Sequence, residues 1–260
     1  LDDGQRQQHK RTSAEGERVA AHAGDKSQTP GAPQRRGRCQ PRNLLPAGKN
    51  RPRTEEADLA LLEKTGVDYV LMPSVEDIYP QKDTRVFDLG TTDKTMEGAH
   101  RPGHFNGVAQ VVSRLFDIVR PERAYFGEKD FQQIAVIREM VRRYGYPVQI
   151  VACPIVRGAD GLALSSRNAL LTPAHRAAAP TIYGALSENA AAARTMSVEE
   201  FRRRVVERID ATKLLKTEYL SVVHAETLEE IDAWSDSFPM RCCIAVQAGD
   251  IRLIDNIAIA

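Results

Sequence analysis

Two short stretches in the middle of the chain carry residue types that suit the binding of a phosphate chain. They are Phe126-Gly127-Glu128-Lys129-Asp130-Phe131-Gln132-Gln133 and Leu162-Ala163-Leu164-Ser165-Ser166-Arg167. In the first, Gly127 lets the backbone approach a ligand closely, and Lys129 brings a positive charge on a flexible stem. In the second, two hydroxyl groups and the Arg167 guanidinium follow one another, and such donors suit phosphate oxygens. The two stretches therefore predict a site for a phosphate-bearing ligand.

The first stretch lies where an apolar strand feeds a helix. Residues 123–126 are typical of a strand, and residues 131–144 of a helix with apolar side chains at helical spacing. In open α/β sheets such a junction binds nucleotides and other anions. We expect Asp130 to cap this helix, with Gln133 three residues later as its capping-box partner. On residue type alone, Lys129 could equally be a solvated loop lysine, and Gln133 only a capping partner.

Further elements are expected on both sides of these stretches. Before them, the pattern predicts a helix from Thr54 to about Lys64 that ends at Gly66, strands over 67–72 and 85–89, and a helix over 105–119. A strand over 148–153 follows the central helix. After Arg167, the pattern predicts helices opened by Thr172 and Ser197, a strand over 218–223, a short helix at Thr227, and a hairpin of 241–247 and 251–254 around Gly249-Asp250.

The order of these elements predicts an α/β fold in two parts. The alternation of strands and helices indicates a Rossmann-like domain with a parallel sheet over residues 51–167. Helices followed by antiparallel strands indicate a small α+β domain over residues 168–260. We expect Cys242 and Cys243, adjacent on one strand, to point to opposite faces of their sheet.

Composition excludes several classes of function. The 260 residues carry a formal net charge of only +1, which implies no strong field for nucleic acid or a membrane. No apolar run approaches the ~20 residues that a membrane-spanning helix needs. Cys39, Cys153, Cys242 and Cys243 lack the spacing of a zinc site, so we expect reduced thiols in a cytoplasmic protein.

Residues 1–50 differ from the rest of the chain. They contain no Phe, Tyr, Trp or Ile and are rich in Gln, Arg, Gly, Pro and Ala. Such a segment cannot bury enough apolar surface to offset the entropy of ordering it, so we expect a disordered arm. A basic tail for nucleic acid or organelle targeting is the alternative.

Three long motifs resemble one enzyme family. F-G-E-K-D-F-Q-Q, P-I-V-R-G-A-D-G-L-A-L-S-S-R-N and R-P-G-H-F-N-G-V look like segments of the pantothenate synthetase, or pantoate–β-alanine ligase, family, and they stand in the family's order. The match runs from about Arg51 to Ala260. The resemblance implies an ATP-dependent ligase of the cytoplasm that uses Mg²⁺ and forms a homodimer, with pantoate and β-alanine as substrates and no nucleic acid or membrane as a partner.

The resemblance also implies roles for individual residues. Lys129 and Arg167 would be catalytic, and Gln133 would bind pantoate. Arg101 and His104 would lie near the substrate pocket, although a lone His is more often structural. The ATP-binding residues implied in this way are Gly127, Glu128, Lys129, Asp130, Val156, Leu164, Ser165, Ser166 and Arg167.

The implied reaction has two steps. The pantoate carboxylate attacks the α-phosphate of ATP, giving pantoyl-adenylate and pyrophosphate, and the amine of β-alanine then gives pantothenate and AMP. Charge builds on the phosphates in the first step, and fixed donors lower the barrier by stabilising that charge. No covalent enzyme nucleophile is required, because positioning and charge stabilisation suffice.

Part of the family pattern is missing from this chain. The family's P-T-M-G-x-L-H-x-G-H and V-N-P-x-Q-F segments have no counterpart in residues 1–50. We hypothesise that these residues come from a shifted reading frame or a sequencing error, and we expect the chain as written to be impaired. A non-catalytic remnant that binds nucleotide or dimerises is the alternative. Another adenylate-forming transferase fits less well, because the P-I-V-R to L-S-S-R run is complete.

Overall fold

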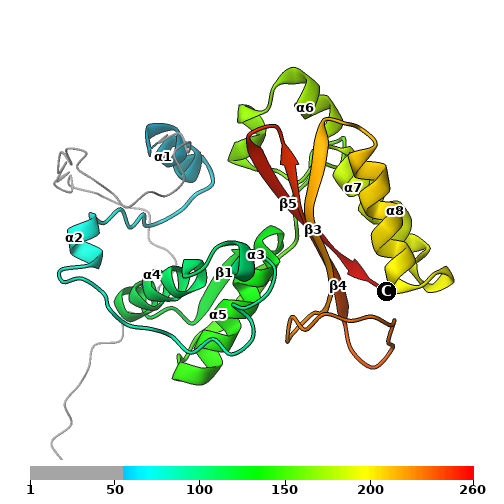
Figure 1. Ribbon diagram of the computed structural model, residues 1–260. Helices are drawn as coiled ribbons and strands as arrows, with labels where there is room; N and C mark the ends of the chain where they lie inside the picture. Colours follow the sequence, from blue (N-terminus) through cyan, green and yellow to red (C-terminus); the bar gives the residue numbers. More distant parts are fainter. Residues whose placement is uncertain (1–54) are drawn as a thin grey trace, which may run out of the picture. The chain divides into compact units, whose positions relative to one another are not determined.

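The computed structural model describes residues 55–260 of the chain (Figure 1). The expectations for residues 1–50 and for the Thr54 cap lie outside these residues. The first described helix is α1 (Glu55–Lys64), and it ends as predicted at Gly66, whose φ of 75° is in the left-handed region. Two short helices that the sequence pattern did not predict follow it, α2 (Val75–Ile78) and α3 (Glu97–His100).

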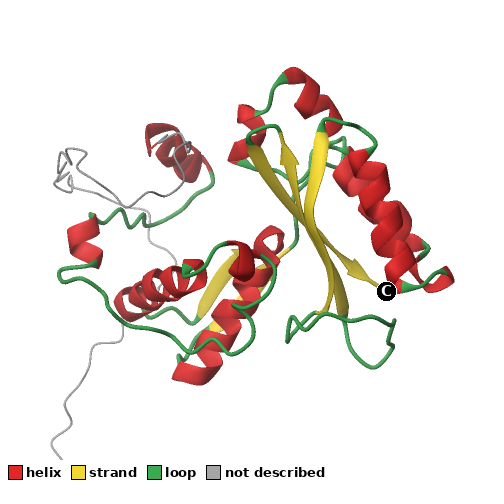
Figure 2. Ribbon diagram, viewed as in Figure 1, coloured by secondary structure: helices red, strands yellow, loops and turns green. Residues whose placement is uncertain are grey.

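A parallel β-α-β unit forms the centre of the first half, as predicted. Its elements are α4 (His104–Val119), β1 (Arg123–Gly127), α5 (Phe131–Tyr144) and β2 (Gln149–Cys153). Strands β1 and β2 run parallel, with Arg123 opposite Gln149 and Gly127 opposite Cys153. Figure 2 shows this pair of strands beside the two helices. One core joins them and includes Phe105, Phe116, Ile137 and Met140. The sequence periodicity therefore located this unit correctly.

Two predicted strands are wrong. Residues 67–72 and 85–89 have no strand structure, and Tyr69 is 93% exposed while Val86 is 85% exposed. A strand needs a partner, and among the described residues the parallel sheet consists of β1 and β2 alone. Helix α4 holds the second segment instead. The Asn106 side chain accepts a hydrogen bond from the Phe87 amide at 2.8 Å, and Gln110 donates one to the Arg85 carbonyl at 2.7 Å.

The second half contains helices packed on an antiparallel sheet, as predicted. Its elements are α6 (Pro173–Ala178), α7 (Thr181–Ala191), α8 (Val198–Asp210), β3 (Leu215–His224), β4 (Met240–Ala248) and β5 (Ile251–Ile259). The sheet order is β3-β4-β5, and α7 and α8 cover one face of it (Figure 1). Thr172 and Ser197 cap their helices through their side chains, as expected. The predicted hairpin is present, although β5 continues to Ile259.

Cys242 lies in the core between the sheet and α7 and α8, and Cys243 lies in a different core that includes Met96 and Phe131, so the expectation of opposite faces is confirmed. The predicted helix at Thr227 is wrong. The His224 ring accepts hydrogen bonds from the Glu226 and Thr227 amides at 3.1 and 3.3 Å, and the chain returns to pair Glu230 with Val223. The local polar contacts of His224 therefore replace a helical turn.

Three short 3₁₀ segments complete the described elements, and two of them matter for the site. Segment η1 (Glu128–Asp130) joins β1 to α5, and η2 (Ser166–Leu170) follows the second motif; the third is η3 (Ala193–Thr195). Both motif segments lie against β5. Asn256 of β5 donates a hydrogen bond to the Glu128 carbonyl at 2.8 Å, and Asp255 pairs with Arg157, which precedes the second motif. The antiparallel sheet therefore supplies one wall of the site.

Candidate nucleotide-binding site

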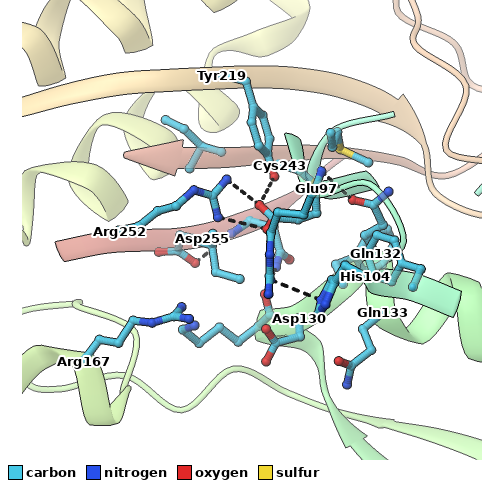
Figure 3. A pocket seen from close by; sticks show the side chains of 18 residues that line it. Glu97, His104, Asp130, Gln132, Gln133, Arg167, Tyr219, Cys243, Arg252 and Asp255 are labelled. Atoms are coloured by element: carbon cyan, nitrogen blue, oxygen red, sulfur yellow. Dashed lines mark hydrogen bonds and ion pairs between the residues drawn. The ribbon is translucent and has the colours of Figure 1, made fainter. Parts of the chain in front are cut away.

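One cavity brings together residues from distant parts of the sequence. It has a volume of about 310 Å³ and lies among α3, α4, the η1–α5 junction, the loop at Arg167 and the strands β3, β4 and β5 (Figure 3). Six of the predicted site residues line it: Arg101, His104, Lys129, Asp130, Gln133 and Arg167. Figure 3 shows Arg167 on the side opposite Tyr219, and it shows Asp130 and Gln133, from the start of α5, with His104, from the start of α4, on the other side of the cavity from Arg167.

Lys129 is the most informative residue of this cavity. Its ammonium group makes no hydrogen bond and no ion pair with any of residues 55–260, although the residue is half-buried. Burial lowers the pKa of Lys129 below its ordinary value, Asp130 opposes this shift, and the nearby Arg167 charge adds to it. A desolvated cation without a close counter-ion is unfavourable by itself. An anionic ligand would therefore stabilise this site.

Asp130 occupies the N-cap position of α5, as predicted, but its side chain does not cap the helix. Its side chain accepts no hydrogen bond at the start of α5, because η1 precedes the helix and gives Asp130 a φ of −94° and a ψ of 57°. The carboxylate is exposed, lines the cavity and makes no hydrogen bond or ion pair within the described part of the chain. It is therefore available to a ligand or to a metal ion.

The two adjacent glutamines of α5 have different environments. Gln132 is buried, and its amide accepts a hydrogen bond from the Glu97 backbone at 3.0 Å and donates to the Thr92 and Thr95 carbonyls, both at 2.9 Å. Gln133 makes no hydrogen bond among residues 55–260 and lines the cavity. The capping-box partnership expected of Gln133 is therefore wrong, and the role as a ligand contact remains a prediction.

A tight hairpin presents the second motif. Gly161 has a φ of 84°, and a Cβ there would come within 2.7 Å of the Tyr183 ring, so glycine is required. The Leu164 amide donates to the Val156 carbonyl at 2.9 Å, which closes the hairpin. Its exit leads Arg167 into the cavity, while Ser165 lines a small adjoining recess together with Lys129.

Six residues predicted for the nucleotide lie outside the cavity lining: Gly127, Glu128, Val156, Leu164, Ser165, which lines the adjoining recess, and Ser166. Val156 and Leu164 are exposed, and Glu128 forms an ion pair with Arg241 at 3.2 Å. Their backbone groups belong to the two segments that border the cavity. Their roles in nucleotide binding remain predictions.

Arg101 and His104 form a pair at the start of α4. The Arg101 Nη1 atom lies 3.2 Å from His104 Nε2, so that ring nitrogen accepts the hydrogen bond and the imidazole is neutral. Burial lowers the pKa of His104, and the Arg101 charge adds to this shift. Both side chains line the cavity, and their place near a substrate remains a prediction.

Sequence reasoning missed Glu97, Tyr219 and Arg252. The Glu97 carboxylate accepts hydrogen bonds from Arg252 at 2.7 and 2.9 Å and from the Tyr219 hydroxyl at 2.9 Å (Figure 3). Burial raises the pKa of this carboxyl, but the hydrogen bonds outweigh burial, and the pKa lies below its ordinary value. The partners of Glu97, Tyr219 and Arg252, lie 122 and 155 residues later in the sequence, on the antiparallel sheet. Local motif spacing therefore could not indicate that Glu97 lines the cavity.

Residues 55–260 contain no group of three or more His, Cys, Asp or Glu side chains arranged to hold a metal ion. Within the same residues, the helices are too short or too polar to cross a bilayer.

Comparisons with known proteins agree with this fold and cavity. The pantoate-beta-alanine ligase family model matches residues 48–258. Pantothenate synthetase of Porphyromonas gingivalis is 55% identical over 206 residues, covering 79% of this chain and 73% of that protein. The Bacteroides thetaiotaomicron protein of the same name is 52% identical over 206 residues with the same coverage.

Solved structures show the same relation. The crystal structure of pantothenate synthetase from Thermus thermophilus has a TM-score of 0.75 and 47% identity, covering 80% of this chain and 75% of that one. Pantoate-beta-alanine ligase from Francisella tularensis, complexed with beta-gamma ATP and beta-alanine, has a TM-score of 0.64 and 31% identity, covering 80% and 70%.

Fold and cavity together define an α/β nucleotidyltransferase-like enzyme, with a parallel sheet flanked by helices and an antiparallel three-stranded sheet. The chain belongs to the pantoate–β-alanine ligase family. The resemblance drawn from the three motifs is confirmed, and the chain is a ligase of pantothenate biosynthesis. The alternative of a non-catalytic remnant is not favoured by these relatives.

Proposed function

We propose that this chain activates pantoate with ATP and joins it to β-alanine through the cavity around Lys129. One observation carries the proposal. The half-buried Lys129 ammonium group lies near Arg167 and pairs with no side chain of residues 55–260. Two cations and the Ser165 hydroxyl, drawn from two separate motifs, suit the oxygens of a triphosphate. The ATP and β-alanine complexed with the Francisella tularensis ligase support this assignment.

In the first step, an oxygen of the pantoate carboxylate bonds to the α-phosphorus of ATP, and pyrophosphate leaves. Lys129 and Arg167 would stabilise the negative charge that develops on the phosphates. The Gln133 amide would donate a hydrogen bond to pantoate without fixing a charge, and the neighbouring Arg101 would attract the carboxylate. In the second step, the β-alanine amine attacks the activated carbonyl, and AMP leaves.

The segments on either side would hold the nucleotide by contacts of backbone and hydroxyl groups. From the first motif these are Gly127, Glu128 and Asp130, and from the second Val156, Leu164, Ser165 and Ser166. The cavity is also suited to Mg²⁺, because this ion prefers one or two carboxylates together with substrate phosphates and water. The exposed Asp130 carboxylate is the protein group that would help to hold it, and the ion would neutralise phosphate charge.

The test is ATP binding by isothermal titration to the chain and to Lys129→Gln. We expect Lys129→Gln to weaken ATP binding at least about tenfold, because one charge-assisted contact to phosphate is lost. Lys94→Gln is the matched control, because Lys94 is exposed, pairs with its neighbour Asp93 and is not among the residues that line the cavity. Equal ATP affinity in Lys129→Gln and the unmodified chain would overturn the proposal.

We also propose that the chain acts in the cytoplasm as a homodimer, on the strength of the family resemblance. Sedimentation equilibrium of the purified chain tests the second point. A monomer throughout the micromolar range would contradict it.

A further inference from the structure

Two adjacent residues of β5 contact both halves of the proposed nucleotide site. Asn256 is only 2% exposed and Asp255 only 5% exposed, although both side chains are polar. Successive side chains of a strand point to opposite faces, so two neighbours can each hold a different segment. The large majority of buried polar groups are hydrogen-bonded, and the Asn256 side-chain NH₂ group and the Asp255 carboxylate follow this pattern, whereas the Asn256 Oδ1 atom has no partner among the described residues.

Asn256 holds the turn that carries Lys129. Its side-chain amide donates hydrogen bonds to two successive backbone carbonyls, that of Glu128 at 2.8 Å and that of Lys129 at 3.1 Å. The turn cannot move away from β5 without breaking both bonds. Because the contact is to the backbone, it fixes the base of the Lys129 side chain and leaves the ammonium group free for a ligand.

Asp255 holds the base of the second motif. Its carboxylate forms two hydrogen bonds with the Arg157 guanidinium, at 2.7 and 2.9 Å. Arg157 also donates to the Gly161 carbonyl at 3.1 Å, and its guanidinium lies 3.7 Å from the centre of the Tyr183 ring. Arg157 and Ala163 pair across the hairpin that leads into Ser165 and Arg167. The position of that hairpin therefore depends on Asp255.

We propose that Asp255 and Asn256 are positioning residues that fix the Lys129 turn and the Ser165–Arg167 segment at the separation a nucleoside triphosphate requires. The inference rests on the proposed function, since it assumes that both segments contact one ligand. Neither residue acts on the reacting atoms. The Arg157 pair occupies the Asp255 carboxylate, so the nearest fixed anion on β5 does not form an ion pair with Lys129.

The first experiment measures hydrogen–deuterium exchange of the full chain by mass spectrometry. In Asn256→Ala, we expect exchange of the Gly127–Phe131 amides to rise about tenfold, because two hydrogen bonds to this turn are lost. Asn189→Ala is the matched control, because Asn189 also donates from its side chain to a backbone carbonyl, that of Ala185 at 2.8 Å, but lies on α7. Asp255→Asn should instead raise exchange in residues 157–164.

The second experiment separates positioning from general stability. The reaction of Lys129 with an amine-acylating reagent is followed against pH by mass spectrometry, with Lys94 as the internal reference. Burial keeps the pKa of Lys129 low, so a loosened turn should move its midpoint up towards that of a solvated lysine in Asn256→Ala. Asn189→Ala should not move it. Asn256→Ser keeps one donor, so its Lys129 midpoint should lie between those of Asn189→Ala and Asn256→Ala. This variant replaces Asn256→Ala in the experiment if Asn256→Ala does not fold.

ATP titration completes the test. We expect ATP affinity to fall about tenfold in Asn256→Ala and Asp255→Asn and to stay unchanged in Asn189→Ala. One outcome is that hydrogen exchange and Lys129 titration change as expected while neither the parent chain nor any variant binds ATP. In that case the positioning role of Asp255 and Asn256 is supported and the proposed function is wrong. If exchange rises equally across the whole chain, or the Lys129 midpoint stays where it is, the positioning role is wrong.

Discussion

At the scale of single residues, Gln132 and Gln133 show how two identical neighbours can serve structure and ligand binding separately. We predict that Gln132→Ala lowers the free energy of unfolding by about 3 kcal/mol, because it leaves the Glu97 amide and the Thr92 and Thr95 carbonyls without this partner. Gln133→Ala should change it by less than about 0.5 kcal/mol, since it breaks no hydrogen bond among the described residues. Urea unfolding measures both.

For pantoate binding we expect the opposite order of effects, with Gln133 mattering more than Gln132. Gln133→Ala should weaken the binding of pantoate in the presence of ATP by about tenfold, which is the worth of one hydrogen bond. Gln132→Ala should weaken pantoate binding only in proportion to the fraction of the protein that is unfolded. A Gln133→Ala chain with unchanged pantoate affinity would remove Gln133 from the site.

His104 gives a prediction in pH. Burial and the Arg101 charge hold its pKa in the folded chain below the ordinary value of 6.5. Below pH 6.5 the unfolded chain therefore binds more protons at this residue than the folded chain, and acid lowers stability. His104→Asn removes this contribution. The unfolding free energy of the parent minus that of His104→Asn should stay constant above about pH 7.5 and shrink as pH falls from there to about 5.5. A difference that is independent of pH would show that the ring does not titrate differently on folding.

Sequence reasoning found the residues whose chemistry is local and missed those whose chemistry is not. Lys129 and Arg167 stand in the short 3₁₀ segments η1 and η2 that connect longer elements, where a charge indicates a ligand. The structure places both in one cavity. Asp130 stands directly before α5, as predicted, but its side chain makes no capping hydrogen bond, and neither residue type nor spacing encodes the 3₁₀ turn η1 that sets its backbone angles. Asn256 reads as an ordinary strand residue until its two carbonyl partners are known.

At the scale of elements, the Glu97–Arg252 pair joins α3 to β5. Arg252 also pairs with Glu218 of β3 at 2.7 Å, so one guanidinium serves two strands and one helix. We predict that Arg252→Met lowers the free energy of unfolding by about 3 kcal/mol, since the buried Glu97 carboxylate loses two charge-assisted hydrogen bonds and keeps only the Arg101 guanidinium, 3.8 Å away, as a cationic partner. The double variant Glu97→Gln/Arg252→Met should recover most of the loss, because no uncompensated charge remains at Glu97.

Arg208→Met is the control for this prediction. Arg208 also pairs with a glutamate, Glu188 at 2.9 Å, but both side chains are more exposed than Glu97 and Arg252. Its loss should cost less than about 1 kcal/mol. Urea unfolding of the four chains decides the matter. A double variant no more stable than Arg252→Met would show that packing of the Arg252 stem, rather than charge, is what matters.

Helices and hairpins with their own internal pattern were predicted correctly, and segments that need a distant partner were not. Helix α5 was predicted with its observed bounds because its apolar period and its Gly145 end are both local. Residues 67–72 and 85–89 have the composition of strands, but a strand forms only beside another strand. In the second segment, side chains of α4 supply the hydrogen bonds that a neighbouring strand would otherwise supply.

At the scale of the whole molecule, the described sheet leaves apolar surface uncovered. Tyr125 on β1 is 62% exposed, and the segment 67–72 exposes Val67, Tyr69, Val70, Leu71 and Met72. Contiguous exposed apolar side chains and an exposed aromatic ring on a two-stranded sheet are unusual in a monomeric protein. The relatives extend beyond the matched region, since the match covers 73% of the Porphyromonas gingivalis protein. Residues 1–50 do not contain the H-x-G-H signature that the family resemblance calls for.

We therefore predict that the chain binds ATP but catalyses pantoate-dependent ATP–pyrophosphate exchange poorly. The comparison is a chimera in which residues 1–47 are replaced by the residues that precede the matched region in the Porphyromonas gingivalis protein. The exchange rate of the chimera should exceed that of the chain by at least about a hundredfold. This is the effect expected from one or two hydrogen-bond donors directed at the negative charge that develops on the phosphates. It should also bind less of a dye that reports exposed apolar surface, because added strands would cover β1. In the chimera, Lys129→Gln should abolish the gain, whereas Lys94→Gln should keep it. Robust exchange by the unmodified chain would show that its own residues complete the site.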